Sequence, residues 1–396
     1  MLTEVNFRAP CNLLGFGLFS FTYFKHMSKF AKVNWEVIGG SPDAKTINKL
    51  CSEFGVRISV LASAIARPLN PDLPLFTIWH HHDLQHENYD VRALIHFETS
   101  TFTPAEVESI SKVTKVGACS DWGLDTIIDN VEGMNPDILP GIYASIETKD
   151  SPAVYNHNGV GAKLKEHFEV DKLFVSGGKW ETRKQHFRLL EPALADATPN
   201  KVMILGLWNN VFTGGLTEPM KALVDRGYQK TERIELSMPG NEPGELVLDI
   251  YRLEKSNISF ALCPFIESMP LMHSIYRASD GYISISAGEG WDQPLVEAMS
   301  LGVPCLATNN TAHSEYITFD NSVRVQCEKE IAYDGQFFMG NKGMWYPPHH
   351  GSLLSQWIYF CIEDLTEIGD NAKNDMIKRH REMSISLENT LGEYLK

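Results

Sequence analysis

The sequence predicts an α/β protein of two domains, each built around a parallel β-sheet. Short apolar runs alternate along the chain with segments of helical periodicity, which is the pattern that βαβ units produce. Several of these runs end at glycines, as residues 35–38 do at Gly39, and glycine suits the turn that follows a strand. The chain has 396 residues, more than one hydrophobic core usually serves, so two domains are expected.

The first half of the chain divides into strands and helices in a regular order. Pro104 begins one helix, and Glu106 and Glu108 follow in its first turns, where the helix dipole favours acidic side chains. The other expected elements are strands at residues 5–7, 35–38, 76–80 and 94–97 and a helix over residues 18–31.

The second half repeats the alternation. We expect strands at residues 172–176, 202–205, 259–263, 282–286 and 304–307, a short helix over residues 293–301, and a last helix over residues 376–396. The hydrophobic pattern thins between about residues 143 and 170, which places the domain boundary there.

Composition excludes several classes of protein. With 50 acidic and 35 basic residues the formal net charge is -15, which argues against a surface that grips nucleic acid or an anionic membrane as a whole. The 7 cysteines are scattered without a CxxC pair, which predicts reduced thiols and no zinc ribbon. We find neither an export signal nor an apolar run long enough to span a membrane, so a cytoplasmic location is expected.

The most informative segment runs from the strand at residues 282–286 through a glycine-containing loop into the helix at residue 293. Asp292 is the expected N-cap and Pro294 lies in the first turn. A strand–loop–helix junction of this kind offers backbone N–H groups and the positive end of a helix dipole to an anion, most often phosphate. Glu297, one turn into the helix, is placed to accept hydrogen bonds from a ribose diol. Glu289, in the loop, is placed to hold a sugar.

The alternative for this segment is that Glu289 and Glu297 are solvated residues flanking a helix start. The sequence GEGWDQPLVEAMSLGVPCLATN argues against it, because the two glutamates eight positions apart in this context resemble the signature of retaining glycosyltransferases of family 4. Asp292 departs from that signature, in which glycine is common at this position, and its side chain would narrow the donor pocket.

A second motif, VSGGKWETRKQHF, follows the strand at residues 172–176. It resembles the cationic motif of the same family, whose two basic residues bind the donor diphosphate, and on that match Lys179 and Lys184 carry the role with Arg183 beside them. Fixed cations stabilise the charge that builds on the leaving diphosphate. Gln185 stands where the family usually has glycine. The alternative is an exposed basic loop.

Near the N-terminus, Gly15 and Gly17 mark a loop after the first strand. It is not a dinucleotide fingerprint, because Ser20 stands in place of a third glycine. The resemblance places this loop across the cleft from the donor, while the alternative is a plain strand-to-helix turn.

The acceptor side offers two groups of polar residues. His96 and Glu98 share one face of a strand end, and the resemblance makes them candidates for contact with the acceptor. A histidine cluster (His80, His81, His82, His86, with Asp83) suggests a metal site, but we interpret it as a loop at the interdomain cleft. Lys25, Lys29 and Lys32 are predicted to share one face of the first helix, either as a solvated face or as a small basic patch.

The resemblance implies the GT-B fold, in which two Rossmann-like domains face each other across a cleft. We assign residues 1–160 to an acceptor-side domain, 161–375 to a nucleotide-sugar-binding domain, and 376–396 to a helix that crosses back to the first domain. It also implies retention of configuration, no metal or other cofactor, and a nucleotide-sugar donor such as a UDP-sugar. The implied catalytic residues are Glu289, Lys179 and Lys184, and the implied donor-binding residues are Gly15, Gly17, Arg183, Gly290, Trp291, Asp292, Leu295 and Glu297.

The acceptor stays open at the level of sequence. A glycan or glycoconjugate hydroxyl is the first expectation, with transfer of a hexose or related sugar, and glycosylation of a modified DNA base is an alternative that demands a local basic cleft. A nucleotide-sugar epimerase or hydrolase of the same fold, or a binding protein without turnover, are further alternatives. A dinucleotide oxidoreductase is disfavoured by the missing glycine fingerprint.

Overall fold

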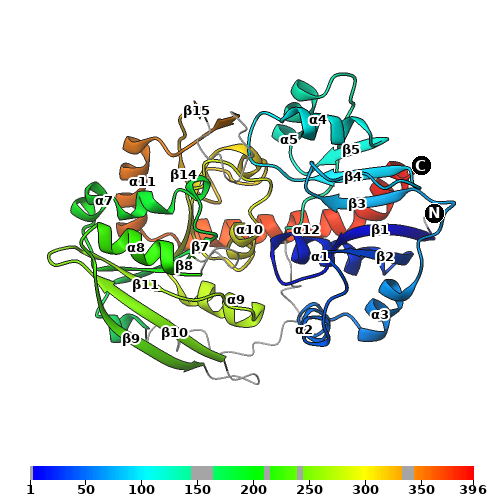
Figure 1. Ribbon diagram of the computed structural model, residues 1–396. Helices are drawn as coiled ribbons and strands as arrows, with labels where there is room; N and C mark the ends of the chain where they lie inside the picture. The colour runs from blue at the N-terminus through cyan, green and yellow to red at the C-terminus, as the bar shows by residue number, and fades with distance from the viewer. Residues whose placement is uncertain (1–2, 144–163, 209–214, 239–243, 332–342) are drawn as a thin grey trace.

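The computed structural model describes residues 3–143, 164–208, 215–238, 244–331 and 343–396. The chain forms two halves, each with its own sheet and its own surrounding helices (Figure 1). The predicted α/β class with parallel sheets is confirmed. The expected domain boundary near residue 160 lies outside the described residues.

The N-terminal half is built on a six-stranded parallel sheet with strand order β2-β1-β3-β4-β5-β6. Its strands are β1 (Glu4–Pro10), β2 (Lys32–Ile38), β3 (Leu75–Trp79), β4 (Val91–Ile95), β5 (Lys115–Ala118) and β6 (Asp137–Ile138). Its helices are α1 (Gly15–Met27), α2 (Ala44–Phe54), α3 (Ile58–Ala66), α4 (Pro104–Ser111) and α5 (Asp121–Asn130).

Local sequence explains where these elements begin and how they pack. Thr103 and Glu106 form a capping box at the start of α4, with Pro104 in its first turn, so the helix starts where the sequence predicted. The ring of Phe7 on β1 packs 5.1 Å from Trp35 on β2 and 5.8 Å from Phe76 on β3, so neighbouring strands share one aromatic core.

The C-terminal half holds an eight-stranded sheet with strand order β14-β13-β12-β7-β8-β11-β10-β9. Its strands are β7 (Lys172–Gly178), β8 (Val202–Trp208), β9 (Gln229–Met238), β10 (Gly244–Arg252), β11 (Ile258–Leu262), β12 (Gly281–Ser284), β13 (Cys305–Thr308) and β14 (Val323–Val325); β15 (Glu330–Ile331) pairs separately with β16 (Met344–Trp345). Its helices are α7 (Pro192–Ala197), α8 (Thr217–Asp225), α9 (Met269–Ala278), α10 (Gln293–Ser300) and α11 (His350–Ile362), with short 3-10 turns η1 (Thr182–Lys184), η2 (His186–Leu190) and η3 (Thr311–Glu315).

One edge of this sheet departs from the prediction. The strands from β14 to β11 run parallel, as predicted, but β10 is antiparallel to β11 and β9 is antiparallel to β10, so two strands that were not predicted add an antiparallel edge. Strand β9 alternates charged and apolar residues over Arg233, Ile234, Glu235 and Leu236, which is the pattern of a strand with one solvated face. An edge strand rich in charge resists pairing with other chains.

The C-terminal helix α12 (Thr366–Tyr394) joins the two halves. It begins ten residues before the segment that the sequence singled out, and it runs along both halves in Figure 1. At its end the Tyr394 hydroxyl donates to the Ala93 carbonyl on β4 at 2.8 Å, and Arg92 donates to the Tyr394 carbonyl at 2.6 Å. These two bonds fix the end of α12 to the N-terminal sheet.

The predicted row of lysines on the first helix is wrong. Helix α1 ends at Met27, so Lys29 lies beyond it, and Lys32 is the first residue of β2. The Lys32 ammonium lies 2.8 Å from a Glu4 carboxylate oxygen on the adjacent strand. Lys25 therefore shares no helix face with the other two lysines.

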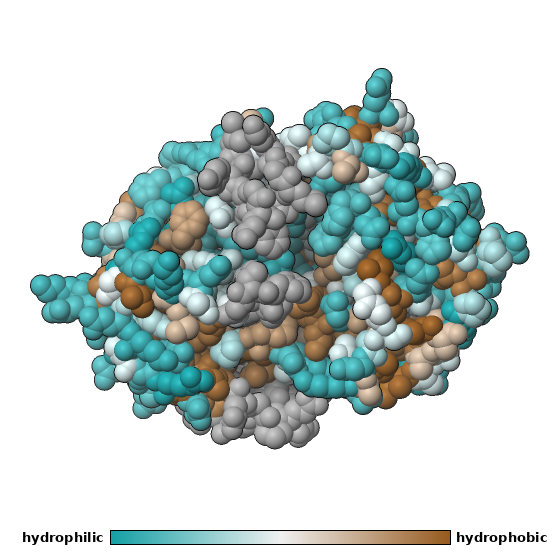
Figure 2. Space-filling model, viewed as in Figure 1, coloured by the Kyte–Doolittle hydropathy of each residue, from teal (hydrophilic) through white to brown (hydrophobic). Residues whose placement is uncertain are grey.

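Hydrophilic residues cover most of the outer surface on the face shown in Figure 2. Among the described residues, none of the helices combines the length and apolar character that crossing a bilayer requires. The apolar side chains gather instead under the two sheets and along α12, where Met376, Met383 and Leu387 are buried.

Candidate functional site

The carboxyl ends of strands from both sheets meet between the two halves. His96 and Glu98 follow β4, the cationic segment follows β7, and the loop with Glu289 follows β12. In open α/β sheets the carboxyl ends of the strands form the ligand crevice, because loops and helix N-termini converge there. The structure therefore brings the two predicted motifs of the C-terminal half opposite the predicted acceptor side.

The loop between β12 and α10 passes very close to the N-terminal half. A Cβ atom at Gly288 would lie 2.3 Å from the Glu98 carbonyl oxygen, and one at Gly290 would lie 2.9 Å from the His96 Cβ. The His96 Nδ1 is 3.4 Å from the Gly290 carbonyl oxygen. Only glycine allows this approach, which explains why the loop carries two of them.

Glu289 lies at the centre of a buried cluster of charges. One oxygen of its carboxylate is 2.7 Å from the Arg183 guanidinium and 2.6 Å from the Lys184 ammonium. Glu181 extends the cluster, because one of its oxygens is 3.3 Å from Arg183 and the other is 3.1 Å from Lys179. Two basic residues of the second motif thus converge on the first glutamate of the other motif.

Burial and pairing together set the electrostatics of this cluster. Arg183 is 5% exposed and Lys184 is 9% exposed, so the alternative of an exposed basic loop is wrong for these two residues. Burial lowers the pKa of Lys184, but the carboxylates of Asp292 and Glu289 outweigh it and the pKa rises. Burial likewise raises the pKa of Glu181, but Arg183, Lys179 and Lys184 bring it below its usual value.

Asp292 does not have the local role that its position suggested. It occupies the N-cap position of α10, but its side chain accepts no hydrogen bond from the helix, and its φ of 59° lies in the left-handed region. Its carboxylate accepts instead from Ser284 and lies 3.4 Å from Lys184 and 3.0 Å from the His313 Nε2. The expected capping interaction is therefore replaced by tertiary contacts.

Glu297 lies one turn into α10, as predicted, and contacts two side chains. The Gln293 amide donates to one carboxylate oxygen at 3.3 Å, and the His273 Nε2 on α9 lies 3.6 Å from the other. Glu297 is 7% exposed. The carboxylate is thus held by neighbours on two helices, apart from the cluster around Glu289.

The side chains of Trp291 and Leu295 point into the protein. The Trp291 indole donates to the Ile142 carbonyl at 2.8 Å and packs on Tyr143 at 5.2 Å, so it ties the loop to the N-terminal half. Leu295 is fully buried in the core, and its amide donates to the Asp292 carbonyl. Any contact of these two residues with a donor would therefore involve their backbone.

The first loop reaches the cleft through an aromatic ring. Gly15 is the first residue of α1 and Gly17 packs against Asn12, where a Cβ would lie 2.3 Å from the Asn12 carbonyl oxygen. Between them, Phe16 packs its ring 4.4 Å from His80 and 5.6 Å from His96. Phe16 therefore lies between the two glycines and contacts two histidines of the N-terminal half.

The histidines of the cluster contact different residues. The His81 Nε2 is 2.9 Å from Glu106, and the His86 Nε2 is 3.2 Å from Glu36. Burial, with a contribution from Lys179 across the cleft, lowers the pKa of His80 to about 3. Within the described residues no group of three or more histidine, cysteine, aspartate or glutamate side chains has the geometry of a metal site.

Sequence reasoning missed several residues of the site. Glu181 was detectable, because it alternates with the basic residues of its own motif at positions 179 and 183. Ser284 lies in the strand that leads into the Glu289 loop, but nothing in the sequence shows that its hydroxyl contacts Asp292. His313 on η3 and His273 on α9 belong to other elements and carried no signal. Only the fold brings them to the two glutamates.

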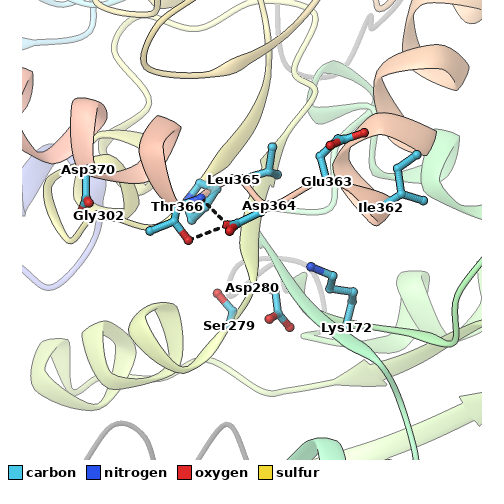
Figure 3. A pocket seen from close by; sticks show the side chains of 11 residues that line it. Lys172, Ser279, Asp280, Gly302, Ile362, Glu363, Asp364, Leu365, Thr366 and Asp370 are labelled. Atoms are coloured by element: carbon cyan, nitrogen blue, oxygen red, sulfur yellow. Dashed lines mark hydrogen bonds between the residues drawn. The ribbon is translucent and has the colours of Figure 1, made fainter.

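A separate hollow lies at the opposite, amino-terminal edge of the C-terminal sheet (Figure 3). Lys172 at the start of β7 and Asp280 just before β12 line it, together with residues from the end of α11 and the start of α12. Asp280 pairs with Lys165 at 2.6 Å, and Asp364 accepts from the Thr366 hydroxyl at 2.6 Å. These polar groups have partners in the protein, so the hollow is not the candidate site.

Comparisons with known proteins bear on the fold. No protein-family model and no curated protein matches the chain. The structure of HepE from Anabaena in complex with UDP is similar, with 16% identity, coverage of 99% of this chain and 100% of that one, and a TM-score of 0.56. Sucrose-phosphate synthase from Thermosynechococcus elongatus shares 10% identity over 99% of this chain and 98% of that one, with a TM-score of 0.60.

A third structure, TarM of S. aureus, is longer than this chain. It shares 13% identity over 81% of this chain and 55% of TarM, with a TM-score of 0.51, so the match spans about half the length of TarM. At these identities the likeness concerns the fold. The chain has the GT-B fold of glycosyltransferases, with two Rossmann-like halves facing each other across a cleft.

Proposed function

We propose that the protein is a retaining glycosyltransferase of family 4, which transfers a hexose or related sugar from a nucleotide-sugar to an acceptor hydroxyl. The observation that carries the proposal is the convergence of Arg183 and Lys184 on Glu289 at 2.7 and 2.6 Å, at the carboxyl ends of the C-terminal strands. A diphosphate needs buried cations, and a sugar beside it needs an acceptor of hydrogen bonds. The cluster supplies both groups within one charge network.

The donor would occupy the site in three parts. The diphosphate binds Arg183 and Lys184, with Lys179 at the more exposed edge, because fixed cations stabilise the charge that develops as the glycosidic bond breaks. The ribose binds Glu297, whose carboxylate accepts from two hydroxyls. The transferred sugar lies against Glu289 and the backbone at Gly290, facing the N-terminal half. The structure of HepE in complex with UDP favours a uridine nucleotide as the first donor to test.

The chemistry follows from the leaving group. The acceptor hydroxyl attacks from the face that the diphosphate leaves, and a phosphate oxygen of the leaving group takes its proton, so configuration is retained. We assign no side-chain nucleophile and no metal to this step. Closure of the two halves excludes water and limits hydrolysis of the donor.

The acceptor side is formed by the N-terminal half. Burial lowers the pKa of His96 to about 4, so the ring is neutral at pH 7, and its Nδ1 hydrogen faces the Gly290 carbonyl. The Glu98 carboxylate on this side lies 3.9 Å from the Arg183 guanidinium. A glycan or glycoconjugate hydroxyl that approaches this side would contact both His96 and Glu98. We place the protein in the cytoplasm.

A panel of UDP-, GDP- and ADP-sugars tests the proposal. We expect one nucleotide series to raise the melting temperature and to be hydrolysed slowly without an acceptor, and Glu289→Gln to suppress the hydrolysis. Stabilisation by none of the series would sink the proposal. Rapid release of free sugar, or conversion to an epimer without any acceptor, would assign the chain to the hydrolase or epimerase alternative instead.

A further inference from the structure

Asp292 and His313 form a fully buried pair beneath the Glu289 loop. The His313 Nε2 lies 3.0 Å from an Asp292 carboxylate oxygen, and the exposed fractions of the two side chains are 0% and 1%. His313 comes from η3, after β13, whereas Asp292 precedes α10. The pair therefore connects two loops at the carboxyl edge of the sheet.

The hydrogen bonds of His313 define the charge of the pair. Its Nδ1 lies 2.9 Å from the Thr308 carbonyl oxygen, which can only accept, so that nitrogen carries a hydrogen. Burial raises the pKa of Asp292, but Lys184 and the His313 ring outweigh it and hold the carboxylate ionised. The Nε2 thus also faces an acceptor, so both ring nitrogens of His313 lie against groups that accept hydrogen bonds.

The second oxygen of Asp292 connects the pair to the cationic motif. It lies 3.4 Å from the Lys184 ammonium, and the same ammonium lies 2.6 Å from Glu289. Lys184 therefore contacts two carboxylates, those of Glu289 and Asp292, and His313 contacts the second of them. Ser284 donates to the oxygen that His313 contacts, which fixes the carboxylate further.

We propose that Asp292 and His313 act together as a positioning pair for Lys184, in which Asp292 orients the ammonium and His313 cancels the charge of Asp292. This inference rests on the proposed function. With the histidine in place, the pair adds no net charge, and Lys184 keeps its full attraction for the donor diphosphate. Without His313, the Asp292 carboxylate competes with the diphosphate for Lys184.

The pair predicts that only the histidine variant weakens the binding of UDP, as measured by calorimetry. His313→Gln keeps a hydrogen-bond donor toward Asp292 but removes the positive charge of the ring. We expect this variant to bind UDP about tenfold more weakly, which is a typical coupling between neighbouring charged residues. Asp292→Asn tolerates the left-handed backbone, leaves UDP affinity equal or tighter, and lowers kcat because the ammonium loses its anchor. The double variant returns to within about threefold of the wild-type affinity.

A purely structural role predicts a different pattern. Both single variants would then weaken UDP binding, and their effects would add in the double variant, which would overturn the inference. Asp292→Gly, which removes the side chain at a φ that glycine accepts readily, serves if the asparagine variant does not fold. Melting temperature and circular dichroism establish folding for each variant.

Nitrogen-15 NMR of the histidine rings supplies a readout that needs no ligand. The signals of His313, identified as those missing in His313→Gln, should show two N–H groups in the free protein. A single N–H would overturn the inference. If the wild-type protein binds no nucleotide at all, both the proposed function and the positioning role fail. Two ring N–H groups on His313 would still establish that Asp292 and His313 form a charged pair.

Discussion

The Lys184 ammonium lies 2.6 Å from the Glu289 carboxylate, although the two residues belong to separate sequence motifs. The Arg183 guanidinium is held by the same carboxylate at 2.7 Å. In this state the cations that we propose for the donor diphosphate are paired with the residue that we propose for the donor sugar. On the proposed function, the donor diphosphate replaces the Glu289 carboxylate at these two cations.

The first prediction follows from this exchange. Glu289→Gln removes the competing anion, so we expect UDP to bind about tenfold more tightly, since close buried charge pairs couple by roughly 1.5 kcal/mol or more. The same variant should lower turnover by a factor on the order of 100, because the transferred sugar loses its partner in the transition state. Calorimetry with UDP and a transfer or hydrolysis assay measure the two effects.

Glu108→Gln is the matched control for that variant. Glu108 pairs with Lys112 on the exposed face of α4, and both side chains are about half exposed or more. It should change neither UDP affinity nor turnover, because exposed pairs of this kind contribute little. If Glu289→Gln bound UDP no better than the control, the exchange of anions would be ruled out, even if turnover fell.

The second prediction separates the two glutamates. Glu297→Ala removes the proposed ribose contact, so it should weaken UMP and UDP binding alike, roughly 10- to 100-fold for charge-assisted hydrogen bonds. Turnover at saturating donor should change much less. Calorimetry with both nucleotides tests the assignment, and a loss confined to UDP would place Glu297 at the phosphates instead of the ribose.

The third prediction concerns stability in mild acid. Burial lowers the pKa of His96 from 6.5 to about 4 in the folded protein. Above pH 6.5 the ring is neutral in both states, and as the pH falls toward 4 only the unfolded chain takes up the proton. The free energy of unfolding should therefore decrease over this range, by roughly 3 kcal/mol for this residue.

His96→Gln should remove that share of the pH dependence, with unfolding by urea at several pH values as the measurement. Burial also lowers the pKa of His26, His80 and His186 to about 3, so a weaker decrease with pH should remain in the variant. A slope in His96→Gln identical to that of the wild type would show that His96 titrates normally.

The sequence predicted those parts of the fold that depend on local pattern. The strand β8 is buried along its whole length, and its unbroken apolar run marked it clearly. The hairpin of β9 and β10 escaped detection because its charged residues, such as Glu232 and Arg233, resemble a solvated segment until the strands pair. Lys32 was misplaced because helical spacing alone does not reveal that α1 ends at Met27.

The residues of the candidate site were likewise predictable only where they belong to a local sequence pattern. Glu289, Glu297 and Lys184 were identified because each belongs to a motif that is contiguous in the sequence. Their partners His313 and His273 could not be, since they meet the motifs only through the order of strands and helices in the C-terminal half. The sequence therefore predicts the residues that we propose to contact the donor. The residues that orient these side chains are found only from the fold.

The last prediction concerns the contact between the two halves. Gly288→Ala would place a Cβ 2.3 Å from the Glu98 carbonyl oxygen, and because that atom belongs to the backbone, the loop or the opposite half must move. The two halves should then close incompletely, which admits water and misplaces Glu289. We expect turnover to fall about 100-fold, as it does when reacting groups are displaced by about 1 Å, with a smaller change in UDP affinity.

Gly392→Ala is the control for this substitution. Gly392 lies within α12, and a Cβ at this position would meet no atom of another element within 4 Å among the described residues. Alanine there should preserve activity and stabilise the helix by roughly 0.5–1 kcal/mol. Small-angle scattering with and without UDP measures closure, and the donor assay measures turnover. Normal compaction and normal turnover in Gly288→Ala would mean that the two halves do not need this close approach, and that Glu289 reaches the donor without the contact at Glu98.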